Sequence, residues 1–101
     1  MKHNKLVRDK IPQIIKNKGE IPVTHTASNE EYWQKLKEKL HEEISEFMKE
    51  DSEEELADIL EVVYSICDYK KIDKEHLEIL RQKKAEEKGS FKDRIILEET
   101  E

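Results

Sequence analysis

The stretch from residue 40 to residue 67 constrains the fold of this chain more than any other, because two helical apolar repeats there carry clusters of carboxylates. The clusters are Glu42, Glu43 and Glu46 in the first repeat and Glu55 and Asp58 in the second. Residues three or four apart in a helix project from one face, so each cluster shares a face of its helix. A short turn would run the two helices antiparallel and allow the clusters to meet across the pair.

The first helix is predicted to begin after Ser28, which forms a Ser-x-x-Glu capping box with Glu31. On a helical wheel its apolar stripe spans about 80°, with Glu43 about 20° outside the stripe and Glu46 about 60° further round. Glu43 is therefore expected at the edge of the buried face, and the helix is expected to end near residue 50 or 51. The stripe consists of Trp33, Leu36, Leu40, Ile44 and Phe47.

A second Ser-x-x-Glu box, Ser52 with Glu55, predicts the start of the next helix. Its apolar residues cover roughly 160° of the circumference, with Glu55 inside this arc and Asp58 at its edge. An arc this wide usually faces more than one neighbour, so the helix is predicted to be central and to contribute to a contact between subunits. The apolar residues are Leu56, Ile59, Leu60, Val62, Val63, Ile66 and Cys67.

Shorter signals describe the rest of the chain. Pro12 suits the first turn of a short N-terminal helix, and Asp73 can cap a helix from Lys74 to Lys88. The segments 21–26 and 94–97 are expected to be extended and to form a minor strand pair. Together these signals predict an all-α fold, an antiparallel helical bundle.

Composition and charge limit the partners of such a chain. Residues 1–101 are expected to form one small domain. Charged residues make up 44% of the chain, which leaves a thin core of the kind that small helical proteins complete by oligomerising. A net charge of -6 argues against a nucleic-acid polymer as the partner.

The same sequence predicts a cytoplasmic protein that does not enter a membrane. No apolar run is long enough to span a bilayer, and the basic N-terminus lacks the apolar segment of a signal peptide. The lone Cys67 cannot form an intrachain disulfide, which fits a reducing compartment.

The carboxylates allow a structural and a functional interpretation. Glutamates on charged helices are usually solvated, and Glu42 alone fits that interpretation. Glu43 and Glu55 fit it less well, because a buried bare carboxylate is costly unless a cation or hydrogen-bond donors compensate it. Hard oxygen ligands select magnesium, manganese or calcium. Magnesium is preferred here, with manganese as a substitute, because a dedicated calcium loop usually supplies carbonyls and a glycine.

A magnesium centre can orient a phosphate chain, polarise phosphorus and lower the pKa of a bound water, which points to phosphoanhydride hydrolysis. That chemistry also needs cations for the phosphate oxygens. Phe91 and Trp33 are candidates for stacking on a base, although Trp33 fits core packing better. The candidate cations, each of which alone is more commonly a surface charge, are Lys5, Arg8, Lys84, Lys88, Lys92 and Arg94.

The two acidic clusters resemble those of the all-α nucleoside triphosphate pyrophosphohydrolase superfamily, which includes MazG, the dimeric dUTPases and phosphoribosyl-ATP pyrophosphatase. The shared pattern is E-E-x-x-E followed on the next helix by E-x-x-D, matched here by residues 42–46 and 55–58. The opening NKLVRDKIP at residues 4–12 is similar to the start of small MazG-like, phosphoribosyl-ATP pyrophosphohydrolase-like proteins. Residues 88–91 match their Gly-Phe element after the last helix. The connection between the acidic motifs is shorter than in many relatives.

The resemblance implies magnesium-dependent cleavage between the α and β phosphates of a nucleoside triphosphate, giving a monophosphate and pyrophosphate. It assigns Glu43, Glu46, Glu55 and Asp58 to the metal. It makes Glu42 and Glu43 the catalytic residues, with Glu42 orienting or deprotonating the attacking water. It also implies a homodimer or homotetramer that removes non-standard nucleotides or acts on a phosphoribosyl-ATP-like substrate. The alternative is a non-catalytic acidic helical module for interactions or nucleotide binding.

Overall fold

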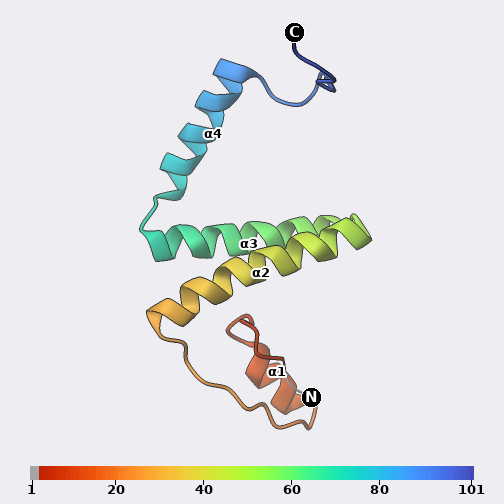
Figure 1. Cartoon of the computed structure of the whole chain (residues 1–101). Helices are drawn as coiled ribbons and strands as arrows, with labels where there is room; N and C mark the ends of the chain where they lie inside the picture. Colours follow the sequence, from red (N-terminus) through yellow and green to blue (C-terminus); the bar gives the residue numbers. More distant parts are fainter. Residues whose placement is uncertain (1–2) are drawn as a thin grey trace.

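The computed structural model describes residues 3–101, and this part of the chain is all-helical. α2 and α3 lie side by side as an antiparallel hairpin, with α1 on one side of it, while α4 extends away on the other (Figure 1). The radius of gyration is 17.9 Å, against about 13 Å for a compact domain of this length. The helices are α1 (Ile11–Asn17), α2 (Asn29–Glu50), α3 (Glu53–Lys70) and α4 (Lys74–Lys88).

A two-residue turn joins the helices of the hairpin. Asp51 ends α2 in the left-handed conformation, with φ 53°, and its backbone N–H donates to the carbonyl of Phe47. Ser52 then caps α3, because its hydroxyl accepts a hydrogen bond from the backbone N–H of Glu55 at 3.3 Å. This confirms the predicted helix ends and brings the acidic part of each helix close to the turn.

Aromatic residues hold the open end of the hairpin together. The ring of Trp33, near the start of α2, stacks on Tyr69, near the end of α3, with centroids 5.2 Å apart. The Tyr69 hydroxyl also donates to the carbonyl of Asn29 at 3.2 Å. Trp33 therefore packs within the fold, as its position in the apolar stripe predicts. The buried apolar residues between the two helices are Leu36, Val62 and Cys67.

The N-terminal segment, residues 3–10, runs along the hairpin before α1 begins. Lys35 of α2 fastens it by donating to the carbonyl of Asn4 at 2.8 Å. Two of its cations contact acidic residues of α2 and α3, Lys5 with Glu42 and Arg8 with Asp58. α1 then starts with Pro12 in its first turn. Basic side chains on this segment are thus brought to the acidic part of the hairpin.

α4 follows α3 after a short turn and begins as predicted, with the Asp73 carboxylate accepting from the Glu75 backbone N–H at 2.9 Å. The chain beyond it, from Gly89 onward, is exposed and lies on the far side of the hairpin from α1 (Figure 1). No helix in residues 3–101 has the length and apolar character needed to cross a membrane.

The predicted strand pair is wrong, since residues 3–101 contain no strand. The segment 21–26 follows α1 and the segment 94–97 follows α4, so the hairpin separates them (Figure 1). Ile21, Val23 and Ile96 are between 82% and 96% exposed. Pro22 also has no backbone N–H to donate to a ladder. Arg94, at the start of the second segment, has a left-handed backbone with φ 62°, and nothing brings the two segments together.

Candidate metal centre

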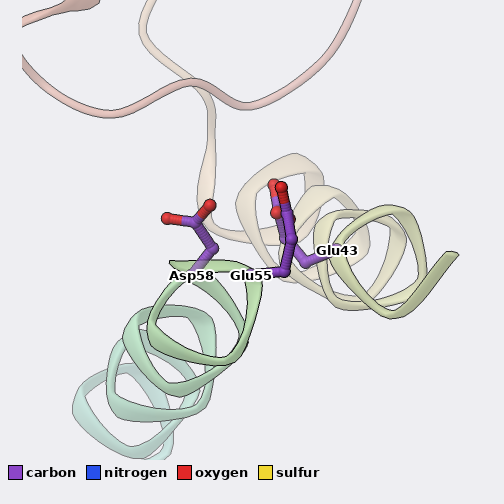
Figure 2. A group of neighbouring side chains, drawn as sticks. All are labelled: Glu43, Glu55 and Asp58. Atoms are coloured by element: carbon purple, nitrogen blue, oxygen red, sulfur yellow. The ribbon is translucent and has the colours of Figure 1, made fainter. Parts of the chain in front are cut away.

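Three carboxylates from the two hairpin helices converge at one place. Glu43 of α2 and Glu55 and Asp58 of α3 each offer an oxygen, and these oxygens all lie within 4.8 Å of one another. Figure 2 shows the Glu43 and Glu55 carboxylates side by side, with Asp58 turned toward the same space from the next turn of α3. Helical spacing explains the arrangement, because residues 55 and 58 share a face of α3 that packs on α2.

The burial of Glu43 and of one oxygen of Glu55 makes negative charge in this group costly. Glu43 is only 9% exposed. One carboxylate oxygen of Glu55, Oε2, is buried and has no hydrogen-bond partner in residues 3–101. Burial raises the pKa of Glu55 above its usual value, and the nearby carboxylates of Glu43, Glu50 and Asp58 raise this pKa further. A buried acceptor without a donor is rare in folded proteins and calls for an explanation, such as an ion.

Lysine side chains compensate the carboxylates on the α2 side. Lys39 lies 3.1 Å from Glu42 Oε2 and 3.3 Å from Glu43 Oε1, one turn along the same helix. Lys5 reaches the other oxygen of Glu42 at 3.1 Å. Burial opposes ionisation of Glu42, but the hydrogen bonds and charges of Lys5 and Lys39 outweigh it and lower the pKa of this carboxyl. The pKa of Glu42 is thus shifted in the opposite direction to that of Glu55.

Arg8 compensates the carboxylates on the α3 side. Its guanidinium donates to Asp58 Oδ1 at 2.7 Å, across 50 residues of sequence. Both side chains are partly open to solvent, with 56% of Arg8 and 38% of Asp58 exposed. No comparable cation lies on Glu55 among the ion pairs within residues 3–101. Within the acidic group, Glu43 is thus paired with Lys39 and Asp58 with Arg8, whereas Glu55 has no cationic partner in residues 3–101.

This donor set fits a small divalent cation. All the donors are carboxylate oxygens, which suit Mg²⁺ and Mn²⁺ better than soft metals. A cation among them would neutralise the repulsion between Glu43 and Glu55 and satisfy the free oxygen of Glu55. Mg²⁺ is commonly held by only a few carboxylates together with waters and ligand phosphates, so these three residues could hold such an ion.

Glu46, the remaining residue of the predicted ligand set, lies outside this group of three. It is half-buried on α2, one turn nearer the hairpin turn than Glu43. Glu46 is separated from Glu43 by three residues, the same spacing as between Glu55 and Asp58, so helical spacing alone does not set it apart from the group. The structure thus brings together three of the four predicted ligands, and a metal contact from Glu46 stays a prediction.

The predicted substrate-binding residues, the candidate cations for phosphate and Phe91 for a base, divide into two sets. Lys5 and Arg8 lie against the acidic residues, as described above. The others are Lys84, Lys88, Phe91, Lys92 and Arg94, which lie on α4 or beyond it and are exposed. No ion pair within residues 3–101 links this second set to the metal centre, and α4 points away from it (Figure 1). Of the cations predicted from the sequence, Lys5 and Arg8 are those that contact the acidic residues within one copy of the chain, in the part that the structure describes.

Sequence reasoning missed Lys35 and Lys39. Together with Lys5 they line a pocket of about 250 Å³ between the N-terminal segment and α2, next to Glu42. Lys39 was recognisable in principle, because it precedes Glu42 and Glu43 by three and four residues on the same helix. Lys35 likewise has a partner one turn along the helix, Glu38 at 3.4 Å, but its hydrogen bond to the carbonyl of Asn4 had no signal in the sequence.

Comparisons with known proteins leave the family of the chain open. No protein-family model matches it. No solved structure matches it either. A protein of Mycolicibacterium smegmatis, described as uncharacterized, is 47% identical over 47 residues, which make up 46% of this chain and 48% of that protein. The match therefore covers about half of each protein and carries no assigned activity.

Proposed function

We propose that this chain is a magnesium-dependent nucleoside triphosphate pyrophosphohydrolase, which cleaves the bond between the α and β phosphates to give a monophosphate and pyrophosphate. The observation that carries the proposal is the meeting of Glu43, Glu55 and Asp58 around a buried, unpartnered oxygen. The resemblance of the two acidic motifs to the all-α pyrophosphohydrolases supports it independently. Mg²⁺ bound there would polarise the phosphoanhydride and activate a water.

Residues of the chain have defined roles in this proposal. Glu43, Glu55 and Asp58 hold the cation, with Glu46 as a further candidate. Glu42, whose pKa is lowered by Lys5 and Lys39, stays ionised and accepts a hydrogen bond from the attacking water. Its low pKa makes it better suited to orient that water than to retain a proton. The lysines of the neighbouring pocket supply positive charge for phosphate oxygens.

The proposal includes a homo-oligomer, a dimer or a tetramer, working in the cytoplasm on nucleotides. Leu56 and Leu60, on the apolar arc of α3, are 51% and 48% exposed in the single chain. Phe91 is 97% exposed, and residues 95–97 are between 77% and 82% exposed. Exposed apolar groups of this kind mark surfaces that bind another protein. Removal of non-standard nucleotides, or a phosphoribosyl-ATP pyrophosphatase-like reaction, is the physiological role proposed for the activity.

A panel of nucleoside triphosphates tests the activity. With Mg²⁺ present, at least one should release pyrophosphate, and release should stop on chelation. Glu55→Gln and Asp58→Asn should each lower kcat at least about 100-fold, since a metal centre contributes several kcal/mol to the transition state. Glu46→Gln then shows whether this fourth carboxylate belongs to the site.

The matched control is Glu54→Gln, which changes an exposed neighbour of Glu55 in the first turn of α3. It should leave turnover and helicity unchanged. Full activity in both Glu55→Gln and Asp58→Asn would reject the assigned site. A protein that releases no pyrophosphate, and whose melting temperature ignores magnesium with nucleotide, would instead be the non-catalytic helical module.

A further inference from the structure

The contact between Arg8 and Asp58 places a protein cation on one of the three carboxylates of the metal centre. The Arg8 guanidinium donates to Asp58 Oδ1 at 2.7 Å. The same Asp58 contributes an oxygen to the group that it forms with Glu43 and Glu55. A divalent cation that binds Asp58 must compete with Arg8, because both draw on the negative charge of the same carboxylate.

The surroundings of Arg8 allow its ion pair with Asp58 to break while the side chain stays at the site. More than half of the Arg8 side chain is exposed, so the pair contributes little to stability and can be broken at small cost. The backbone is held on both sides. Lys35 binds the carbonyl of Asn4, Lys5 binds Glu42, and the carbonyl of Arg8 accepts from the backbone N–H of Ile11 at 3.0 Å. A released guanidinium therefore stays beside the carboxylates.

A phosphate ligand offers Arg8 a second partner in the same place. Guanidinium groups bind phosphate through two parallel hydrogen bonds, a geometry that an ammonium group does not provide. The adjoining pocket is lined by Lys5, Lys35 and Lys39 together with Glu38 and Glu42, so each lysine has a carboxylate partner that it can exchange for a phosphate, as Arg8 has in Asp58. Phosphates attached to a cation at the centre would thus arrive where Arg8 is released.

We propose that Arg8 is an exchangeable cation of the metal centre, which holds Asp58 in the empty protein and transfers to a phosphate of the ligand when a divalent cation takes Asp58. This inference rests on the proposed function, because it needs a divalent cation at the three carboxylates. Through Arg8, the N-terminal segment then opposes metal binding in the absence of nucleotide and favours it in the presence of nucleotide. Nucleotide and metal then bind cooperatively through one side chain.

The test measures binding without turnover, with Mn²⁺ as the metal and α,β-methylene-ATP as a nucleotide that cannot be cleaved. Free Mn²⁺ is counted by electron paramagnetic resonance. Arg8→Gln should bind Mn²⁺ alone about three- to tenfold more tightly than the natural protein, because a competing charge is gone. In the presence of Mn²⁺ it should bind the analogue roughly tenfold more weakly, because a bidentate phosphate contact is lost.

Two further variants serve as controls. Arg8→Lys keeps the charge, so its affinity for Mn²⁺ alone should stay near that of the natural protein, while its affinity for the analogue should fall partway. Lys16→Gln removes an exposed charge of α1 that has no ion pair in residues 3–101, and it should change neither affinity. These variants separate the charge of Arg8 from the geometry of its guanidinium group.

The possible failures can be told apart. If the natural protein binds Mn²⁺ but Arg8→Gln binds it no more tightly than Lys16→Gln does, the exchange is refuted and the metal centre stands. If Arg8→Gln binds Mn²⁺ more tightly but binds the analogue unchanged, transfer to phosphate is refuted. If the natural protein binds neither Mn²⁺ nor the analogue, the metal centre and the exchange fall together.

Discussion

Two segments near the ends of the chain have similar compositions, but only one of them packs on the hairpin. The N-terminal segment, residues 3–10, and the C-terminal segment, residues 89–97, both mix basic side chains with aliphatic ones. The first lies on the hairpin, with Lys5 and Arg8 on acidic partners and Leu6 half-buried. The second has no ion pair within residues 3–101, and Ile95, Ile96 and Leu97 are mostly exposed.

The comparison teaches that geometry, not composition, decides which segment docks. The N-terminal segment finds carboxylates on α2 and α3 because the chain passes along the hairpin. α4 instead carries the C-terminal segment away, so its apolar residues find no cover within the same copy (Figure 1). We therefore expect the N-terminal segment to act within one copy and the C-terminal segment to act between copies.

The largest expected effect is on association. Ile96→Asp should raise the dissociation constant of the proposed homo-oligomer at least about 100-fold, because a charge replaces an apolar side chain that the contact would bury. Sedimentation velocity over a concentration series measures this. Thr100→Asp, in the same tail, should leave the mass unchanged. An unchanged dissociation constant in Ile96→Asp would contradict the expectation that the C-terminal segment acts between copies.

The next effect concerns the stability of a single copy. Leu6→Ala should lower the free energy of unfolding by about 1–2 kcal/mol, because Leu6 is half-buried against the hairpin. Ile96→Ala should change it by less than about 0.5 kcal/mol in protein dilute enough to be monomeric, because the side chain is already exposed. Urea unfolding compares the two. Equal losses would mean that the C-terminal segment also packs within one copy.

A smaller effect is expected at Glu55, the carboxylate that neither terminal segment reaches. Its pKa is raised in the folded protein, so metal-free protein should lose stability as the pH rises from 4.5, its ordinary value, through the raised pKa. Glu55→Gln should abolish this loss and melt higher at pH 7. Added Mn²⁺ should raise the melting temperature of the natural protein but much less that of the variant. A variant that melts lower at pH 7 would contradict this account.

The smallest effect is the opposite pH dependence of Glu42. Lys39 and the N-terminal Lys5 lower its pKa, so the stability it contributes is present above pH 4.5 and is lost as the pH falls through the lowered pKa. Lys5→Gln should shrink that contribution and slightly raise the midpoint pH of acid unfolding. Lys88→Gln, a matched change near the other end, should not. Identical acid unfolding of the two variants would show that Lys5 does not act on Glu42.

Features encoded by nearby residues were predictable from the sequence. The caps Ser28, Ser52 and Asp73 and the ends of the helices follow from side chains two or three positions away. The meeting of Glu43 with Glu55 followed from helical periodicity and a short turn. Only the serine half of each predicted capping box is present: the hydroxyls of Ser28 and Ser52 accept from the backbone as expected. The carboxylate of Glu31 instead binds His25, and that of Glu55 joins the acidic group.

Features that depend on distant parts of the chain were not predictable. The Arg8–Asp58 pair spans 50 residues, and no periodicity relates an N-terminal segment to a helix so far along the sequence. The sequence offered basic candidates at both ends, and only the path of the chain separates Lys5 from Lys88. The expected strand pair was wrong for the same reason, since extended character in two segments does not bring them together.

The stacking of Trp33 on Tyr69 gives the protein an optical property of its own. Trp33 is the only tryptophan in the chain, so the intrinsic fluorescence excited at long ultraviolet wavelengths comes from the open end of the hairpin. This fluorophore lies ten residues from Glu43, about 15 Å along α2. Its emission spectrum should therefore follow separation of the aromatic rings, not occupancy of the acidic end.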